Sequence, residues 1–303
     1  MSDDAPGLLA RLYVGLQGIL PQHGLSRLMY RLARVEWPPL RVPLTWVFIR
    51  VTGIRMAEAA EPNPRRYRHL NALFTRTLRP ELRPLDPDPA SVLSPVDGTL
   101  SQIGTIEAGR LIQAKGQDFA LADLLGGGPG VGRQLEGGAF ATLYLSPKDY
   151  HRIHMPLSGD LTELVHVAGR LYSVNGTTAA LVPGLFARNE RVICRFETPA
   201  GPMVMVLVGA IFVGGIETVW AGELTPVASR HKIAPRHGPG EVRLPRGAEM
   251  GRFNLGSTVI LLFPPGTLTW DPALTPGSAV RMGQRIGTLI HPAGTSPPAP
   301  RGG

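Results

Sequence analysis

The sequence predicts an α+β protein in which amphipathic N-terminal helices precede a mainly antiparallel β core, built as a sandwich or barrel. Apolar residues recur at helical spacing within the first 35 positions. From residue 91 onward, short β-type runs alternate with glycine and proline turns. With 303 residues, 43% of them hydrophobic, the chain can bury a substantial core.

Two amphipathic helices are predicted near the N-terminus, each from a stripe of apolar residues at helical spacing. The stripes are Leu9, Leu12, Leu16, Ile19 and Leu20, then Leu25, Leu28, Leu32 and Val35. A third apolar patch at residues 46–51 is interrupted by Arg50 and followed by Gly53. No stretch therefore approaches the roughly 20 apolar residues that a membrane-spanning helix needs, and we expect the chain not to cross a membrane.

Positive charge is concentrated in the same N-terminal region. The whole chain carries a formal net charge of +8, and residues 1–80 contain twelve arginines, no lysine and five acidic residues. A basic amphipathic segment can lie on an anionic membrane with its apolar side in the headgroup region. It can equally cap a protein core and show its arginines to water. Charge and periodicity alone leave both interpretations open.

A proline-rich connector at residues 61–89, partly helical around 67–78, leads into the β region. We predict strands at residues 140–145, 191–196, 203–208, 211–219 and 259–263. The glycine cluster at 126–132 lacks the Gly-Lys-Ser/Thr of a phosphate loop, so we expect a flexible loop there. Residues 292–303 are rich in Pro, Gly and Ser and predict a loose tail.

The pair Gly256-Ser257 comes directly before the predicted core strand at 259–263. Glycine tolerates a strained backbone at the peptide bond before the serine, and a rigid strand would fix the hydroxyl beside its own preceding carbonyl. This arrangement suits a chain that cleaves its own backbone. An ordinary strand entry is by itself the far commoner reason for these residues, so other motifs must decide.

Three further residues can supply acid–base chemistry. His151 and His154 lie between Pro147 and Pro156, which disfavour a helix, and on a strand they would point to opposite sides. We expect no metal site, because no cysteine or acidic pair completes one. The two histidines could instead serve as a base and an acid. Asp97 either braces a tight turn or accepts a hydrogen bond from His154 in a serine triad with Ser257.

Four separated motifs together resemble the bacterial phosphatidylserine decarboxylase proenzymes, which depend on a pyruvoyl group and cleave themselves. The motifs cover residues 94–98 (SPVDG), 149–156 (DYHRIHMP), 185–192 (LFARNERV) and 249–258 (EMGRFNLGST). They occur in the order found in the family, and the likeness extends from the N-terminal helices to about Ile286.

The resemblance implies self-cleavage between Gly256 and Ser257. Ser257, deprotonated by His154 with Asp97 behind it, attacks the Gly256 carbonyl and forms an ester. Elimination then leaves dehydroalanine, which hydrolyses to a pyruvoyl group and ammonia. The pyruvate-derived cofactor forms a Schiff base with phosphatidylserine, CO2 leaves, and phosphatidylethanolamine is released. The resemblance further assigns His151 as proton donor and Ser173 as a residue near the substrate carboxylate, although Ser173 also suits a turn.

The implied organisation has three parts: an N-terminal helical membrane-associating segment (residues 1–85), a β-rich catalytic core (86–256) and a small chain (257–303) that begins with the pyruvoyl group. The cleaved chains stay together as a heterodimer, of which a further dimer is conceivable. A lipid substrate favours the membrane interpretation of the helices, peripheral and on the cytoplasmic face, with no nucleic-acid partner. The only cysteine, Cys194, excludes an internal disulfide and fits a reducing compartment.

Two rival functions remain. The first is a serine hydrolase that uses Asp97, His154 and Ser257 on external esters. The second is a basic membrane-surface binding module without catalysis. They differ from the decarboxylase in the fate of Ser257, which only the decarboxylase converts.

Overall fold

The computed structural model describes residues 7–114, 116–127, 132–212, 215–225, 232–233, 240–254 and 256–290. N-terminal helices precede a mainly antiparallel β body, as the sequence predicts. The longer helices are α1 (Leu8–Ile19), α2 (Gln22–Leu32) and α3 (Pro38–Thr52), and the short ones are α4 (Leu70–Phe74), α5 (Leu121–Leu124), α6 (Gly176–Leu181) and α7 (Leu185–Arg188). Single 3-10 turns are η1 (Met56–Glu58), η2 (Pro64–Arg66), η3 (Pro80–Leu82) and η4 (Arg133–Leu135).

A large antiparallel sheet forms the centre of the molecule. Its strand order is β12-β7-β8-β9-β15-β5-β2-β17, with β13 also paired to β7. The bounds are β2 (Gly98–Thr105), β5 (Ala139–Leu145), β7 (Gly159–Val167), β8 (Arg191–Thr198), β9 (Gly201–Val208), β12 (Lys232–Ile233), β13 (Arg243–Leu244), β15 (Ser257–Phe263) and β17 (Ala279–Val280). β15 lies between β5 and β9 and is hydrogen-bonded to both.

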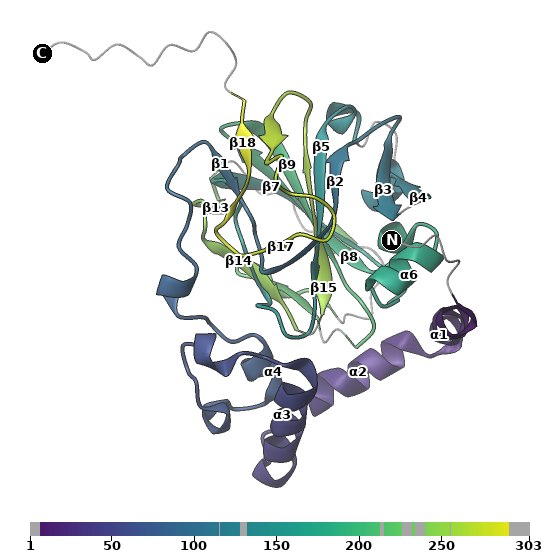
Figure 1. Ribbon diagram of the computed structural model, residues 1–303, viewed down its shortest axis with the longest axis vertical. Coiled ribbons are helices and arrows are strands. Elements are labelled where there is room, and N and C mark those ends of the chain that lie inside the picture. Colours follow the sequence, from purple (N-terminus) through teal and green to yellow (C-terminus); the bar gives the residue numbers. More distant parts are fainter. Residues whose placement is uncertain are drawn as a thin grey trace, which may run out of the picture.

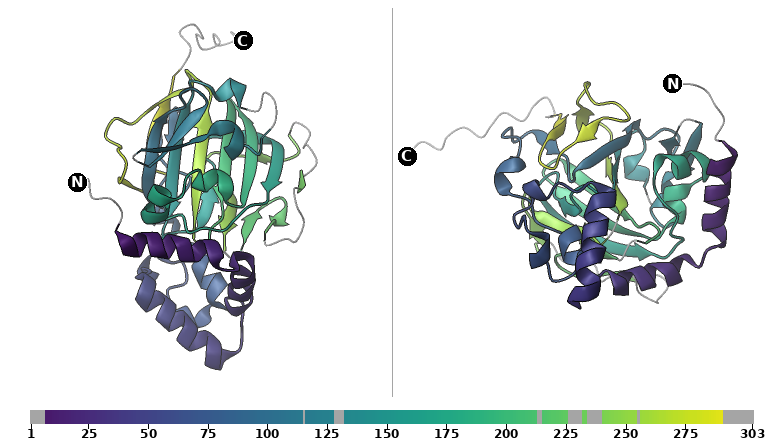
Figure 2. Two further views of the ribbon diagram at one scale, coloured as in Figure 1. Left: turned by 90° about the vertical axis from the view of Figure 1, so that its right-hand side faces the viewer. Right: turned by 60° about the horizontal axis from the view of Figure 1, so that its bottom comes forward.

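Three smaller sheets surround the central one (Figures 1 and 2). The first has the order β11-β10-β14-β6 and contains β6 (Arg152–His154), β10 (Ile216–Thr218), β11 (Gly222–Glu223) and β14 (Glu249–Phe253). The second has the order β1-β18-β16, namely β1 (Ser91–Leu93), β18 (Arg285–Leu289) and β16 (Leu268–Trp270). The third is the hairpin of β3 (Arg110–Ala114) and β4 (Gln117–Ala120).

Strand β15 is buried on both faces because its alternate side chains enter two different cores. Val259, Leu261 and Phe263 pack in one core with the strands of the smaller sheets. Ile260 and Leu262 pack in the other core, which α5, α6 and α7 cover. A strand buried in this way is held rigidly, so its first residue, Ser257, has a fixed position.

The predicted helices and four of the five predicted strands are confirmed, with small shifts of their ends. The strand predicted at residues 211–219 is wrong as a continuous element. Among the described residues of this stretch only β10 forms, and Phe212 has a positive φ of 65° in a turn before it. Gly215 has a φ of +145°, and a Cβ there would overlap the carbonyl oxygen of Thr225. The glycine therefore ends the turn and admits a close backbone approach that sequence periodicity does not reveal.

The N-terminal helices gather at one end of the β body (Figure 1, lower part; Figure 2). The third apolar patch lies within α3, which continues through the internal Pro43 and ends at Gly53 in a left-handed conformation. Within the described residues no helix is both long and apolar enough to span a bilayer. The predicted tail, Leu255 and residues 128–131 of the glycine cluster lie outside the described residues.

Candidate active site

Ser257 is the first residue of β15 and pairs with Leu145, the last residue of β5. Its side chain is buried, and among the described residues its hydroxyl oxygen has no hydrogen-bond partner. A buried hydroxyl without a partner carries a free-energy penalty that native structures avoid. Gly256 precedes it with a φ of +37°, in the left-handed region that favours glycine. The scissile peptide that the sequence suggests therefore lies at a special backbone position.

His151 is also buried, and its ring stacks on Phe74 with 4.0 Å between ring centroids. Its Nδ1 lies 2.9 Å from the backbone carbonyl of Asp149, which can only accept, so we assign the ring proton to Nδ1. Nε2 then carries a lone pair and has no hydrogen-bond partner among the described residues. Burial lowers the pKa of His151 to about 3, so the ring is uncharged at neutral pH.

His151 lies close to the segment that leads to Ser257. Its backbone carbonyl accepts a hydrogen bond of 3.0 Å from the N–H of Phe253, the last residue of β14. Three residues separate Phe253 from Ser257, the first residue of β15.

His154 is the last residue of β6, and both of its ring nitrogens have partners. Nδ1 donates to the carbonyl of Gly247 at 2.8 Å, and Nε2 accepts from the Tyr150 hydroxyl at 3.1 Å. This tautomer follows because a backbone carbonyl cannot donate. Burial lowers the pKa of His154, which leaves Nε2 as an available base at neutral pH.

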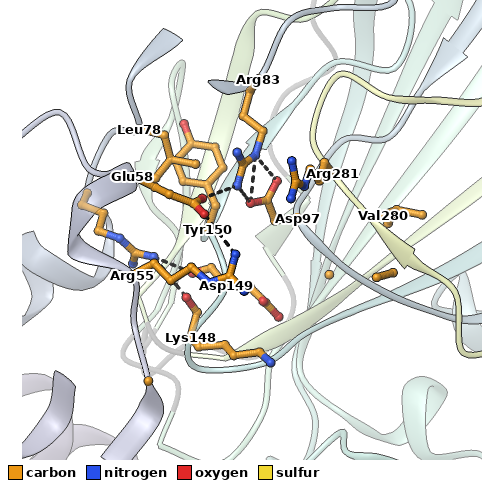
Figure 3. A pocket seen from close by; sticks show the side chains of 14 residues that line it. Arg55, Glu58, Leu78, Arg83, Asp97, Lys148, Asp149, Tyr150, Val280 and Arg281 are labelled. Atoms are coloured by element: carbon orange, nitrogen blue, oxygen red, sulfur yellow. Dashed lines mark hydrogen bonds and ion pairs between the residues drawn. The ribbon is translucent and has the colours of Figure 1, made fainter. Parts of the chain in front are cut away.

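Asp97 lies just before β2 and is engaged by Arg83 (Figure 3). Nε and Nη2 of Arg83 donate to the Asp97 carboxylate at 2.8 and 2.5 Å, and the backbone N–H of Met282 donates to it at 2.9 Å. Arg83 also donates to Glu58 at 2.8 Å. The partners of Asp97 and of His154 therefore differ from those expected in a triad, and in this structure no hydrogen bond joins the two side chains among the contacts described.

The backbone nevertheless brings Asp97, His154 and Ser257 to the same end of the central sheet. The N–H of His154 donates to the carbonyl of Pro95, two residues before Asp97, at 2.8 Å. β2 and β15 flank β5, and Thr99 and Thr258 both pair with Tyr144. Asp97 and Ser257 are therefore separated by one intervening strand.

Ser173 is half-buried in the segment before α6. Its N–H donates to the side-chain oxygen of Gln17 at 2.7 Å, and Asn175 caps α6. The side chain of Asn189 ties this segment to the sheet, because it donates to the carbonyls of Tyr172 and Gly209 at 2.8 and 2.9 Å. Gly209 follows the residue of β9 that pairs with Thr258, so Ser173 belongs to the same end of the molecule as Ser257.

Comparison with known proteins decides the family. The family described as phosphatidylserine decarboxylase matches residues 70–288, and a second family, described as PSD, matches residues 12–53. A phosphatidylserine decarboxylase proenzyme of Azotobacter vinelandii is 51% identical over 281 residues, covering 91% of this chain and 98% of the relative. The chain belongs to the phosphatidylserine decarboxylase family.

Other relatives agree. Proteins named phosphatidylserine decarboxylase proenzyme from Nitrosococcus oceani and Bordetella avium are 52% and 50% identical, over 90% and 93% of this chain. The matches cover 90% and 95% of those relatives. Members of the phosphatidylserine decarboxylase family are carboxy-lyases, so the expected enzyme class is confirmed.

A pyruvoyl group, which the resemblance implies, would arise from Ser257, and the surroundings of this residue fit it. A reactive group at this position would sit at the mouth of a rigid strand. The hydroxyl of Ser257 and Nε2 of His151 are buried without described partners. Both atoms are thus free to take part in chemistry instead of holding the fold together.

Several residues of this candidate site were not assigned from the sequence. Tyr150 lies within the histidine motif, but only the structure shows its contact with His154. Arg83 lies in the proline-rich connector and gives no sequence signal. Asn71 of α4 donates to the side-chain oxygen of the fully buried Asn254 at 3.0 Å. Asn254 belongs to the fourth motif and lies three positions before Ser257. This position was the one sequence signal that could have identified it.

The N-terminal helices of this family member bury polar residues and expose many apolar ones. Many of their large apolar side chains are exposed, as with Leu9 (83%) and Ile19 (85%), whereas the buried residue of α1 is Gln17 (3%). The apolar residues that do pack against a core, only partly buried, include Val14, Met29, Leu44 and Phe48. α2 buries Gln22 and Ser26, and α3 buries Thr45. The further exposed large apolar side chains of these helices and the Trp37 turn are Leu8, Leu12, Tyr13, Leu16, Leu28, Leu32, Trp37, Leu40, Trp46, Val47 and Val51. Such a surface is typical of a protein or membrane contact.

Proposed function

We propose that this chain is a phosphatidylserine decarboxylase that generates its own pyruvoyl group by cleavage between Gly256 and Ser257. The observation that supports this most directly is the buried, unpartnered hydroxyl of Ser257 directly after a glycine at positive φ. Family membership makes a catalytic use of that hydroxyl the best explanation of its isolation.

In the proposed cleavage, His154 removes the hydroxyl proton of Ser257, and Asp97 supports the charge that develops on the ring. The oxygen of Ser257 attacks the Gly256 carbonyl carbon, the peptide C–N bond breaks, and the protonated nitrogen becomes an amine. Loss of the α-proton of residue 257 then expels the Gly256 carboxylate and leaves dehydroalanine. Addition of water releases ammonia and leaves the ketone.

This role requires Nε2 of His154 to exchange its contact with Tyr150 for one with Ser257. It also requires Asp97 to reach the histidine while it remains next to Arg83. The backbone near Asp97 is already adjacent to His154, because the N–H of His154 is hydrogen-bonded to Pro95. Catalytic hydrogen bonds are often incomplete before the reacting geometry forms.

The two products, residues 1–256 and 257–303, should remain associated. β15 has neighbours on both sides and apolar residues on both faces. Cutting the peptide before Ser257 removes none of these contacts, so hydrophobic burial holds the small chain in place.

The pyruvoyl group would supply a ketone that condenses with the primary amine of phosphatidylserine and withdraws electrons as CO2 leaves. We assign His151 to deliver the proton that replaces CO2. Its Nε2 has no described partner and must first take up a proton, because the ring is uncharged at neutral pH. Ser173 is assigned to the substrate carboxylate. The product is phosphatidylethanolamine.

The exposed apolar faces of α1, α2 and α3 are proposed to rest on the cytoplasmic surface of an anionic membrane. Exposed leucines and tryptophans would enter the headgroup region, and the many arginines of residues 1–80 would meet lipid phosphates. The exposure of many apolar side chains favours this over capping, because capping helices bury their apolar side.

Intact-mass measurement of the purified protein tests the proposal. We expect two chains, the smaller comprising residues 257–303 with a blocked N-terminus, and a single uncut chain for Ser257→Ala. An uncut wild-type chain that hydrolyses esters would instead establish the serine hydrolase. Membrane binding that is retained without any catalysis in wild type would establish the binding module.

The two histidines are separated by the same measurement. His151→Ala should split into two chains but release little CO2, whereas His154→Ala should stay whole. Equal loss of splitting in both variants would refute this division of roles.

A further inference from the structure

A cavity of about 210 Å³ opens beside Asp97, between the end of α3, the start of β2 and the turn at residues 146–149 (Figure 3). Its walls carry more basic than acidic side chains. The basic ones are Arg55, Arg76, Arg83, Lys148 and Arg281, and the acidic ones are Glu58, Asp97 and Asp149.

The acidic groups already have partners. Glu58 and Asp97 both accept hydrogen bonds from Arg83. The Asp149 carboxylate accepts from the backbone N–H of Ser146 at 2.8 Å and from its hydroxyl at 2.7 Å. Glu58 also pairs with Arg55 at 3.4 Å, so two arginines balance two carboxylates, and among the described lining residues Asp149 is the one further anion that faces the three other cations of the cavity.

Arg76 is a cation without a bound carboxylate. It is only 4% exposed, and its hydrogen-bond partners among the described residues are backbone carbonyls, including that of Lys148 at 3.1 Å. Its Nε is buried without a hydrogen-bond partner among the described residues. Burial lowers its pKa, while Asp97, Glu58 and Asp149 offset part of that effect at longer range. A buried guanidinium placed in this way favours an anionic partner.

Two exposed cations complete the cavity. Lys148 and Arg281 line it, and within the described part of the chain neither forms an ion pair. Three cations on different segments therefore face one space and are free to bind the same anion.

The position of the cavity relative to Ser257 suits a phospholipid headgroup. Gly98 lines the cavity, and the pairing of Thr99 and Thr258 with the same residue, Tyr144, places Gly98 and Ser257 across β5 from each other. Two strand spacings amount to about 10 Å. In a serine phospholipid only a two-carbon chain and the ester oxygen separate the amine from the phosphorus. An amine held at residue 257 thus brings its phosphate toward these cations.

The cavity also borders the proposed membrane surface. Gly53 and Arg55 line it, and they directly follow α3, on which Trp46, Val47 and Val51 are exposed. We propose that Arg76, Lys148 and Arg281 form a binding site for a phosphate-ester anion, and that this site takes the phosphodiester of the lipid headgroup. The lipid assignment rests on the proposed function, whereas the anion site itself does not.

The test uses the exposed cations, whose removal should not disturb folding. Lys148→Gln and Arg281→Gln are compared with Arg285→Gln, a matched exposed arginine four positions away that does not line the cavity. With mature enzyme, we expect each cavity variant to raise KM for glycerophosphoserine and for phosphatidylserine vesicles about tenfold, with kcat little changed. Arg285→Gln should match wild type.

Phosphate binding to uncleaved Ser257→Ala protein, followed by calorimetry, separates this inference from the proposed function. Inorganic phosphate should bind, and Arg281→Gln in that background should weaken it about tenfold. Weakened phosphate binding with unchanged KM would identify free phosphate, not the lipid, as the source of the anion. Unchanged phosphate binding together with unchanged KM in both cavity variants would overturn the site.

Discussion

The hydroxyl of Tyr150 donates a hydrogen bond of 3.1 Å to Nε2 of His154, the one nitrogen of that ring able to act as a base. The other nitrogen is occupied by the carbonyl of Gly247, which fixes the tautomer. In this structure the proposed base, Nε2 of His154, therefore has a fixed orientation but is occupied by the hydroxyl of Tyr150.

Removing the Tyr150 hydroxyl should expose the base. A neutral hydrogen bond contributes about 1 kcal/mol, so we expect Tyr150→Phe to split a few-fold faster than wild type. A time course of chain splitting after synthesis measures this, with Tyr67→Phe as a control, because the Tyr67 hydroxyl donates to the carbonyl of Glu61 and not to His154. Slower splitting in Tyr150→Phe would mean that Tyr150 orients His154 instead of covering it.

Asp97 has two candidate roles, as a partner of Arg83 and as a member of the triad. Arg83→Met leaves the buried carboxylate of Asp97 without its cationic partner and should cost about 3 kcal/mol of unfolding free energy, while splitting continues. Asp97→Asn should abolish splitting. Thermal unfolding and intact mass, measured on both variants, distinguish the two roles. Continued splitting in Asp97→Asn would show that Asp97 has a structural role only.

Acidification should lower the free energy of unfolding, because His151 is buried in its uncharged form. Its pKa is about 3 in the folded protein and near 6.5 when unfolded, so between these values the unfolded chain binds more protons. Stability is therefore fully present above pH 6.5 and falls on acidification. From pH 7.5 to 5.5 we expect a loss of about 1 kcal/mol from this residue.

Urea unfolding of the uncleaved Ser257→Ala protein at both pH values measures this loss. His151→Gln in the same background should show a smaller decrease. His154, whose pKa burial also lowers, adds to the effect with the same sign. An identical pH dependence with and without His151 would contradict the prediction.

Gln17, the buried residue of α1, should affect turnover and not membrane binding. Gln17 accepts from Ser173 N–H, and Gln22 accepts from Leu171 N–H at 2.8 Å, so the helices hold the segment that carries Ser173. Gln17→Met should reduce turnover of glycerophosphoserine several-fold and leave vesicle binding unchanged. This size is expected because loss of one buried hydrogen bond costs about 1 kcal/mol, which corresponds to a several-fold change in rate.

The exposed neighbour Leu16 provides the converse variant. Leu16→Ser should weaken binding to anionic vesicles and leave turnover of the soluble substrate unchanged, because its side chain is 57% exposed. Flotation with vesicles and CO2 release from glycerophosphoserine are the two measurements. Parallel loss of both properties in both variants would show that the helices act as one structural unit without separate roles.

Local sequence determined the elements of this protein. The helices α1 and α2 and the strands β5, β8, β9 and β15 follow from apolar periodicity, since the spacing of their apolar residues matches the repeat of each element. Gly256 and Ser257 were identified for the same reason, because a glycine before a β-branched run is a local signal. The prediction at residues 211–219 failed where a close approach of Thr225 to Gly215 overrides the pattern.

The tertiary structure alone decided which side chains meet. Arg83 reaches Asp97 from a segment without any motif, and Gln17 reaches Ser173 across 156 positions of sequence. Periodicity says which face of a helix is apolar, but not that α1 turns its apolar face outward and its glutamine inward. That choice depends on which backbone groups of the β core lack partners, and only the folded chain brings these groups to the helix.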